Sequence, residues 1–353
     1  MRDGYRVLDA DGHVIEPLGL YDSAYLNPWD HVPTTPRIPC GDLELVRDQI
    51  ENRFDAPSYL RAMDRQGIDA AVLFPSLALF VPFLPELDAA ASANACRAYN
   101  DWIAEYCATD PTRLTAVGVV PIIDPARAAD EVRHIASLGL AGVFMRPNYL
   151  YDRNLGDRAY DPVYEAIVET GLMLGVHEAL GLRGVHTIGS DRFDTFGLRH
   201  AHSHAMEQMA AAASMLLEGA LERHPELRVA FLESGTGWLP YWLARLDDHW
   251  EWMRDTEYSE VSMRPSEYFA RQCVISSDPE DRLASITVDR FGADHVMWGS
   301  DFPHPDATFP GAVDEFIEEG GLDEDALRGV LWDTPLRFYR LEARFPSPAT
   351  VGG

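Results

Sequence analysis

Short runs of apolar and β-branched residues recur along the chain and predict eight β-strands. These runs cover residues 5–10, 70–74, 114–120, 141–145, 172–177, 228–232, 272–276 and 295–300. Most of them are followed by stretches with apolar residues at three-to-four spacing, which is typical of amphipathic helices. The clearest helical stretches are 89–107, 125–138, 162–170, 205–223 and 279–291. The alternation of strands and helices predicts an α/β protein.

The strands read as nearly continuous apolar runs, so we expect both of their faces to be buried, as in a parallel sheet. Eight strand–helix units close naturally into a (β/α)8 barrel, also called a TIM barrel, and 353 residues is an ordinary length for one. An open doubly wound sheet is the alternative. We predict a single barrel domain over residues 1–345 and a loose tail over residues 346–353.

Two stretches interrupt the repeat and predict long inserted loops after strands one and five. They are residues 20–57, rich in Pro, Asp and aromatic residues, and residues 180–198, rich in Gly, Arg and Asp. Such loops often serve as lids or substrate walls. The segment 75–87 (PSLALFVPFLPEL) is unusually apolar for a loop. It predicts either an apolar wall at the entrance to the site or a subunit contact, for which a homodimer is the expected form.

The formal net charge of −28 disfavours partners that carry dense negative charge. Nucleic acid and anionic membrane surfaces are therefore not expected to bind. An anionic small-molecule substrate would need a local positive charge, from a metal ion or from an arginine such as Arg146.

The cysteines and the N-terminus predict a cytoplasmic protein. Cys40, Cys96, Cys107 and Cys273 lack the spacing of a zinc ribbon, and we interpret them as free thiols in a reducing compartment. The chain shows no signal sequence and no apolar run long enough to span a membrane. It also lacks the glycine-rich loops that bind nicotinamide, flavin or ATP.

Residues able to bind a metal stand at the ends of four predicted strands, where the active site of a barrel lies. Asp11 and His13 follow the first strand, His177 ends the fifth, Glu233 follows the sixth and Asp301 follows the eighth. Imidazole and carboxylate groups suit Zn, Mn or Fe as divalent ions, and the carboxylates would repel one another without a cation. Each residue alone has a structural interpretation, as a helix cap or a hydrogen-bonded core group. Their coincidence favours a metal site.

The segments LDADGHVIEP, LGVHEA and MWGSDFPHPD, in this order and spacing, resemble the amidohydrolase superfamily. They are most similar to its amidohydrolase-2 branch, which includes aminocarboxymuconate-semialdehyde decarboxylase. The resemblance extends from residue 8 to residue 339, with GSDFPH its most specific part. It implies a (β/α)8 barrel that holds one divalent metal ion through four residues. Matched position by position, these are Asp11, His13, His177 and Asp301.

The sequence departs from that pattern at two positions. Asp11 stands where the family has a histidine, which favours harder ions such as Mn or Fe over Zn. Glu233-Ser234-Gly235 stands where the decarboxylases carry His-Gly-Gly, so their usual acid–base histidine is absent. Glu233 is a candidate general base or a ligand of a second ion. The alternative is that it only orients His177 or His204.

Further candidates surround this set. His204 resembles a family histidine that enters the pocket, so we list it as a catalytic residue and as a second-ion ligand with Glu233. His200 and His202 are interpreted as residues of a solvated loop. His304 is a catalytic candidate near the metal, and Glu16 is either near the metal or only a cap of the next segment.

Three functions follow from these residues, and we rank hydrolysis first. In that hypothesis a metal-activated water attacks an amide, ester or thioester, for which an apolar acyl group is possible, and Asp301 takes the proton. One metal ion is the preferred count, although a binuclear site has enough donors. The alternative enzyme is a non-oxidative decarboxylase of an aromatic or enoic acid, which the missing histidine disfavours. The third hypothesis is a metal-binding barrel without catalysis.

Overall fold

Eight parallel strands in sequential order form the centre of the molecule. The computed structural model describes residues 1–17, 19–21, 44–179, 185–190 and 192–345. Every residue of these strands is buried. The strands are β1 (Leu8–His13), β2 (Ala70–Phe74), β3 (Leu114–Val119), β4 (Gly142–Met145), β5 (Met173–His177), β6 (Val229–Leu232), β7 (Cys273–Ser277) and β8 (Val296–Trp298).

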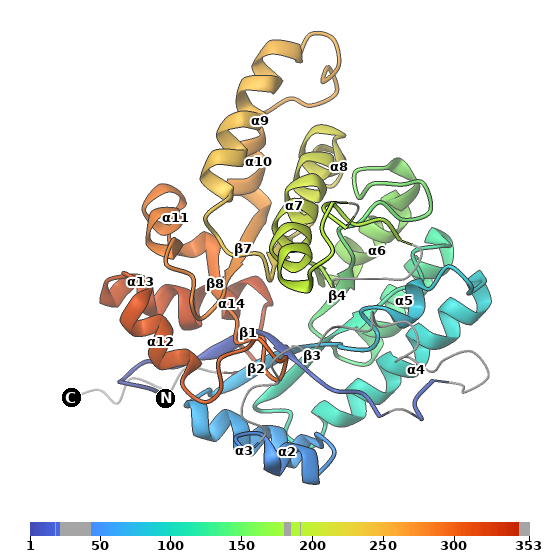
Figure 1. The fold of residues 1–353 in the computed structure, drawn as a ribbon. Helices are drawn as coiled ribbons and strands as arrows, with labels where there is room; N and C mark the ends of the chain where they lie inside the picture. The colour runs from blue at the N-terminus through green and yellow to red at the C-terminus, as the bar shows by residue number, and fades with distance from the viewer. Residues whose placement is uncertain (18, 22–43, 180–184, 191, 346–353) are drawn as a thin grey trace.

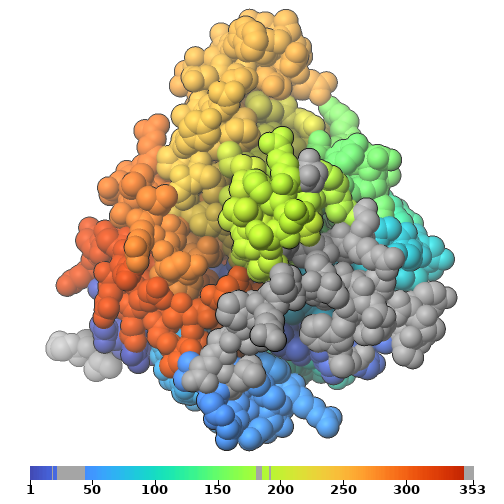
Figure 2. Space-filling model, in the orientation of Figure 1, coloured from blue at the N-terminus to red at the C-terminus, as the bar shows by residue number. Residues whose placement is uncertain are grey.

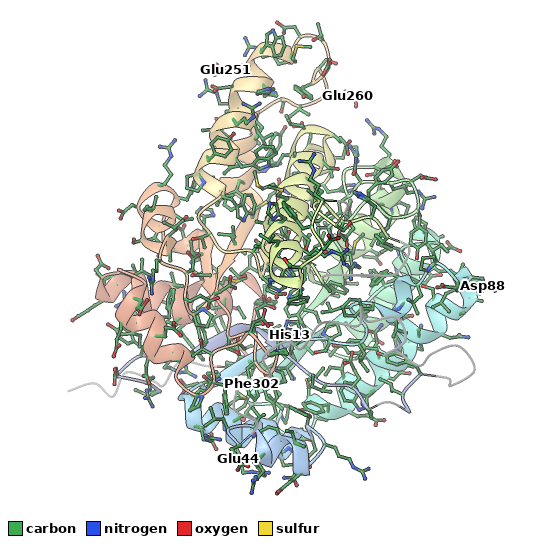
Figure 3. The ribbon with its side chains drawn as sticks, viewed as in Figure 1. His13, Glu44, Asp88, Glu251, Glu260 and Phe302 are labelled. Carbon is green, nitrogen blue, oxygen red and sulfur yellow. The ribbon has the colours of Figure 1, made fainter. Side chains whose placement is uncertain are left out.

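Backbone hydrogen bonds join the last strand region to the first and so complete the barrel. The Asp301 N–H donates to the Asp11 carbonyl at 2.9 Å, and the His13 N–H donates to the Phe302 carbonyl at 2.7 Å. Figure 3 shows His13 and Phe302 close together near the centre of the view. The prediction of a (β/α)8 barrel is confirmed, and these bonds fix the end of β1 against the segment that carries Asp301.

Helices cover the barrel and fill most of the connections between its strands (Figure 1). The α-helices are α2 (Arg47–Glu51), α3 (Ala56–Gln66), α4 (Ala89–Cys107), α5 (Pro125–Ser137), α6 (Asp161–Thr170), α7 (Phe196–Leu217), α8 (Ala220–Arg223), α9 (Leu239–Met253), α10 (Pro265–Gln272), α11 (Ala284–Phe291), α12 (Ala312–Glu319), α13 (Glu324–Arg328) and α14 (Thr334–Phe338). Single 3-10 turns occur at η1 (Val81–Phe83), η2 (Arg158–Tyr160) and η3 (Ala293–His295), and η4 (Gly329–Asp333) is a π-helix.

Local capping explains where several helices begin. Asp55, Asp88 and Asp124 each accept backbone N–H bonds from the first turn of α3, α4 and α5, which satisfies donors that have no partner within the helix. Gly67 and Gly171 end α3 and α6 in the left-handed conformation that favours glycine. Short connections then return each chain segment to the next strand.

The predicted boundaries differ most from the structure at three places. β1 runs to His13 rather than ending at Ala10, because its polar residues point into the buried end of the barrel instead of forming a loop. Helix α7 begins at Phe196 rather than at Ala205 and ends at Leu217, before Gly219 takes a left-handed conformation. The helix predicted at 279–291 begins only at Ala284.

Helix α7 lies at the centre of the face shown in Figure 2, and α9 projects away from the barrel. Glu251 and Glu260 lie near the tip of that projection (Figure 3). The single barrel domain over residues 1–345 stays a prediction. Several predicted features lie outside the described residues: the tail 346–353, most of the first inserted loop, part of the second, and Cys40. The other cysteines, Cys96, Cys107 and Cys273, are free and buried.

Candidate metal centre

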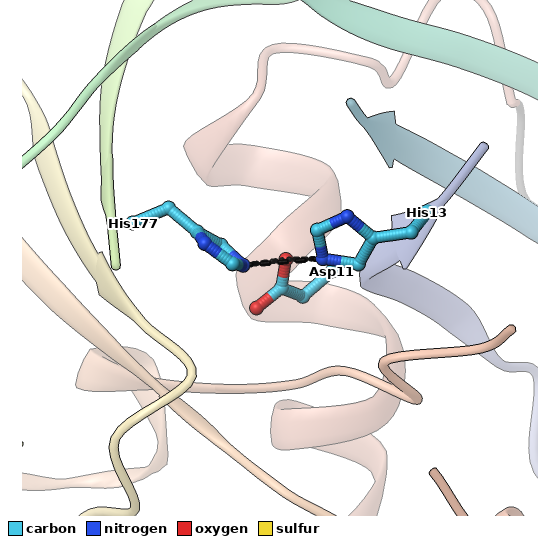
Figure 4. A group of neighbouring side chains, drawn as sticks. All are labelled: Asp11, His13 and His177. Atoms are coloured by element: carbon cyan, nitrogen blue, oxygen red, sulfur yellow. Dashed lines mark hydrogen bonds and ion pairs between the residues drawn. The ribbon is translucent and has the colours of Figure 1, made fainter. Parts of the chain in front are cut away.

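Asp11 and His13 project from the end of β1 into the buried top of the barrel. The pairing of β1 with β2 shifts register between Asp9 and Gly12, so this end of the strand is irregular. Both side chains are almost completely buried. His177 ends β5 and is fully buried as well. Strands far apart in the sequence therefore deliver three metal-binding groups to one point (Figure 4).

Hydrogen bonds fix which nitrogen of each histidine faces that point. Nδ1 of His13 lies 2.8 Å from the Pro75 carbonyl, and Nδ1 of His177 lies 2.7 Å from the Glu178 carbonyl. A carbonyl only accepts, so each Nδ1 must carry the proton and donate it. The two Nε2 atoms are then unprotonated in the neutral rings. This is the arrangement that orients a histidine as a metal ligand.

Two of the three donor separations are those of ligands around one ion, and the third is slightly longer. Ligand atoms about 2.1 Å from a shared ion lie about 3.0 to 3.4 Å apart in octahedral or tetrahedral geometry. Nε2 of His13 and Nε2 of His177 are 3.1 Å apart. Oδ1 of Asp11 lies 3.4 Å from His177 Nε2 and 3.7 Å from His13 Nε2. That buried Oδ1 atom has no hydrogen-bond partner, so the donor set fits a divalent cation.

Asp301 joins this set from the segment after β8. Its Oδ1 lies 3.4 Å from His13 Nε2 and 2.6 Å from Nδ1 of His304. His304 Nε2 in turn lies 2.9 Å from the Ser76 hydroxyl. Asp301 has a φ of 54°, a left-handed conformation that is uncommon outside glycine. The backbone bond from Asp301 to Asp11 holds it there.

Glu233 lies between two histidines at the end of β6. Its Oε2 atom is 3.3 Å from His177 Nε2, and its Oε1 atom is 3.4 Å from His204 Nε2. It too has a left-handed φ, 48°, and its N–H donates to the Ser276 hydroxyl. Burial, together with the charges of Asp301 and Asp11, raises the pKa of Glu233 well above its ordinary value. Glu233 thus contacts His177, one of the candidate metal donors, and its role at a metal stays a prediction.

A cavity of about 260 Å³ opens beside these groups. Acidic residues dominate its polar lining: Glu233, Asp278, Glu280, Asp301 and Asp306. Burial and the neighbouring carboxylates raise the pKa of Asp278, and burial raises that of Glu280. Among the described residues no lysine or arginine lines this cavity. An anionic substrate therefore needs cations bound at the site.

Helix α7 contributes histidines to the cavity, and here the sequence prediction was partly wrong. His200 lines the cavity together with His204, although we predicted a solvated loop for it. Only His202 matches that prediction in facing away: its Nδ1 donates to the Leu198 carbonyl, and its ring contacts Phe193. His200 and His204 are one helical turn apart, so they share a face of α7, while His202 does not.

Glu16 supports the apolar loop 75–87 and lies outside the metal-donor groups. Its carboxylate accepts the backbone N–H groups of Ser76, Leu77 and Ala78 at 2.8 to 3.2 Å. Most of the loop is buried in the core, and among the described residues it does not line the cavity. The loop instead supports two histidines of the site from outside the cavity. The Pro75 carbonyl accepts a hydrogen bond from His13 Nδ1, and the Ser76 hydroxyl contacts His304 Nε2. Because the loop is buried in the core, its apolar residues give no support to an apolar substrate.

Arg146 does not supply the positive charge that we considered for it. It is fully buried after β4, and its guanidinium donates to Asn148, to the carbonyls of Leu79 and Ala179, and to Glu178 at 3.5 Å. Burial raises the pKa of Glu178 to about 8, in spite of Arg146. This network fixes the residue that follows His177. The sequence analysis missed it because nothing in the spacing of these residues indicates a contact.

Asp9 is a second group that the analysis missed. Its carboxylate accepts from the Ser300 N–H at 2.9 Å and from the Ser300 hydroxyl at 2.5 Å. Burial raises the pKa of Asp9 to about 7, against the lowering effect of these bonds. The only signal in the sequence was a carboxylate inside an apolar strand. Asp9 thus ties β1 to the segment that carries Asp301.

Comparison with known proteins identifies the family of this barrel and its metal-donor cluster. The model of the amidohydrolase family matches residues 8–341. A curated relative, 2-amino-3-carboxymuconate-6-semialdehyde decarboxylase from Dictyostelium discoideum, is 25% identical over 85% of this chain and 81% of its own. The crystal structure of 5-carboxyvanillate decarboxylase from Sphingomonas paucimobilis has a TM-score of 0.75 and 26% identity, covering 96% of this chain and 99% of that one.

A more distant structure shows the same fold. Dihydroxybenzoic acid decarboxylase from Polaromonas, solved with bound manganese and the inhibitor 2-nitroresorcinol, has a TM-score of 0.71 and 20% identity, with coverage of 96% and 98%. The chain belongs to the amidohydrolase family, in its amidohydrolase-2 branch, and is an enzyme. No helix among the described residues is long and apolar enough to cross a membrane.

The preference for hydrolysis was wrong, because these relatives are named as decarboxylases. The expected amide, ester and thioester substrates are therefore wrong as well. The argument rested on the histidine missing after β6, but α7 brings another imidazole, that of His204, to within 3.4 Å of Glu233.

Proposed function

We propose that this protein is a metal-dependent, non-oxidative decarboxylase of an aromatic or enoic carboxylic acid. The observation that carries the proposal is the position of His204 and Glu233, a pair able to exchange a proton, on the wall of a cavity that the metal-donor cluster adjoins. Relatives of the chain over most of its length are decarboxylases of such acids. The reaction converts R–COO⁻ and one proton into R–H and CO2.

Asp11, His13, His177 and Asp301 would hold the metal ion. Two imidazoles and two carboxylates suit Mn, Fe or Zn as divalent ions, and the excess of oxygen donors over the family pattern favours Mn or Fe. When bound, the ion supplies the positive charge that binds the anionic substrate and stabilises negative charge in the transition state. The Nδ1 bonds to Pro75 and Glu178 hold both imidazoles in the required orientation.

The remaining groups handle the proton and the position of Asp301. The carbon that loses CO2 must gain a proton, and the pair of Glu233 and His204 lies where it can store and deliver one. His304 donates a hydrogen bond to Asp301 and contacts Ser76, so it is a positioning residue. The carboxylates that line the cavity repel an anionic substrate, so it can bind only beside a bound cation.

The experiment is a CO2-release assay on metal-loaded protein. Separate samples loaded with Mn, Fe and Zn are incubated with hydroxybenzoates that carry a carboxyl group beside a hydroxyl, with 5-carboxyvanillate and with an enoic acid. We expect stoichiometric CO2 and the decarboxylated product, and none from chelator-treated protein. Lack of turnover on every carboxylate by protein of full metal content would contradict decarboxylation. The homodimer and the cytoplasmic location stay predictions.

A further inference from the structure

A cavity of about 320 Å³ opens at the end of the barrel opposite the metal-donor cluster. Leu172, Arg228 and Gln272 line it, and each directly precedes one of the strands β5, β6 and β7. The cavity therefore lies at the amino-terminal ends of these strands, whereas the metal donors follow carboxyl-terminal ends. Arg271 and Arg340 also line it. Three guanidinium groups thus gather at one place in a chain of net charge −28.

None of the three arginines forms an ion pair with a carboxylate in the part of the chain that the structure describes. Arg228 and Arg340 both donate to the Gly171 carbonyl, at 2.6 and 3.5 Å. Arg271 donates through Nε to the side-chain oxygen of Gln272 at 2.8 Å. Carbonyl and amide oxygens accept the hydrogen bonds of a guanidinium but carry no compensating charge. The three arginines therefore keep their charge for another partner.

Like charges repel each other in this cavity. Burial and the charge of Arg340 lower the pKa of Arg228 to about 10, against a smaller opposing effect of Glu342. Glu226 is exposed and is the single carboxylate among the described lining residues. Three positive charges therefore face one negative charge, and a bound anion would lower the free energy of this arrangement.

We propose that Arg228, Arg271 and Arg340 bind a phosphate group. A guanidinium is planar, and its paired N–H groups match the oxygens of a phosphate or a carboxylate. Three arginines against Glu226 leave two positive charges, which a phosphate dianion balances and a single carboxylate does not. A phosphate bound here would link the starts of β5, β6 and β7 to the segment that follows α14, so binding should stabilise the folded chain. The site concerns anion binding and stands whichever reaction the enzyme catalyses.

Isothermal titration calorimetry of metal-free protein with inorganic phosphate tests the proposal. The protein is dialysed against a chelator and then against plain buffer, so that phosphate cannot bind to an ion among Asp11, His13 and His177. At low salt and mildly alkaline pH we expect one phosphate per chain, with a dissociation constant below about 1 mM.

Parallel titrations identify the kind of anion. Tighter binding of glycerol phosphate would assign the site to a phosphate ester, and tighter binding of inorganic phosphate would assign it to the free ion. Benzoate carries one carboxylate charge and should bind at least about tenfold more weakly than phosphate. Benzoate that binds as tightly as phosphate would contradict the assignment to a phosphate group.

Arg271→Gln and Arg340→Gln are the test variants, because both side chains are exposed and their loss should leave the fold intact. Each variant removes one positive charge and should weaken phosphate binding at least about fivefold. Arg337→Gln is the matched control, because this exposed arginine lies on α14 and does not line the cavity. It should bind phosphate like the wild-type protein. Arg228 is left unchanged, because it also supports the backbone at Gly171.

Thermal unfolding gives a second readout. Phosphate should raise the Tm of the wild-type protein by at least about 2 °C more than sodium chloride at the same ionic strength. The double variant Arg271→Gln/Arg340→Gln should lose this difference, and circular dichroism confirms that it is folded. Phosphate binding weaker than about 1 mM in the wild-type protein would overturn the proposal. Equal binding in the double variant, or a Tm shift that sodium chloride reproduces, would overturn it as well.

Discussion

The Nε2 atoms of His13 and His177 lie 3.1 Å apart although 164 residues separate the two histidines in the sequence. Each ring donates its Nδ1 proton to a backbone carbonyl, so both Nε2 atoms present lone pairs to the same point. Two lone pairs at this distance repel unless a cation lies between them. The barrel therefore builds a metal-binding geometry through backbone contacts, and this relationship carries the predictions on metal binding below.

Replacing His177 with Ala should remove the metal and leave the fold intact, because the side chain sits above the packed barrel core. We expect kcat/KM to fall at least about 100-fold, with the loss of one metal ion per chain. Metal content and circular dichroism are the measurements. His224→Ala is the control: this histidine pairs with Asp161 instead and should keep full metal content. Full metal in His177→Ala would place the ion elsewhere.

Replacing Asp11 with Asn should change the free energy of unfolding in opposite directions with and without bound metal. The buried Oδ1 atom of Asp11 has no partner in the protein and adds to a cluster of carboxylates. Without metal, removing its charge should raise the free energy of unfolding by about 1 kcal/mol. With metal, the variant should bind the ion at least about tenfold more weakly and be less stable than the wild type. Urea unfolding with chelator or with Mn²⁺ measures both, and equal effects in the two conditions would argue against a cation at Asp11.

Replacing Glu16 with Ala should destabilise the protein by about 3 kcal/mol, because it leaves three buried backbone N–H groups without an acceptor. Glu16→Gln keeps one acceptor oxygen and should cost less. Glu86→Ala, an exposed change in the same loop, should leave the unfolding midpoint within error. Thermal and urea unfolding provide the test. A stable Glu16→Ala variant that lost metal would instead place Glu16 at the metal centre.

Asp161 should make stability depend on pH in the acid range. Burial alone would raise its pKa, but hydrogen bonds from Arg223 and His224 outweigh burial and lower it below its ordinary value. Since the folded-state pKa is the lower one, the contribution is present above the unfolded pKa of about 3.9 and is lost as the pH falls through the folded pKa. Asp161→Asn should therefore cost about 1 kcal/mol at pH 7. The difference should shrink below about pH 4, and a deficit that stays constant there would contradict this assignment.

The fold could be predicted because the spacing of apolar residues in the sequence reflects which faces of each element pack into the core. The run 70–74 is β2 at the predicted bounds, and 89–107 is α4. The errors occur where polar residues serve the site: β1 was predicted to end at Ala10 because the polar residues Asp11 and His13 follow it. The first turns of α7 were missed because their histidines face a cavity instead of a core.

The candidate site could be predicted only where its donors end strands. Asp11, His13 and His177 do so and form one group of possible ligands, while Asp301 contacts His13 within a second group; their binding of one ion stays a prediction. The pairing of His204 with Glu233 was expected from the resemblance, whereas the place of His200 on the same face of α7 was not, since it depends on where the helix begins. The choice of reaction was wrong because it gave too much weight to the histidine missing after β6, while α7 places another imidazole, that of His204, 3.4 Å from Glu233.

Decarboxylation is tested most directly by nuclear magnetic resonance in D2O. Metal-loaded enzyme is given a hydroxybenzoate labelled with carbon-13 in its carboxyl group. We predict labelled CO2 and bicarbonate equal in amount to the arene formed, with one deuterium on the carbon that carried the carboxyl group, and neither product from His177→Ala. Labelled carboxylate that persists while the same metal-loaded enzyme cleaves an amide or ester would contradict the proposed function.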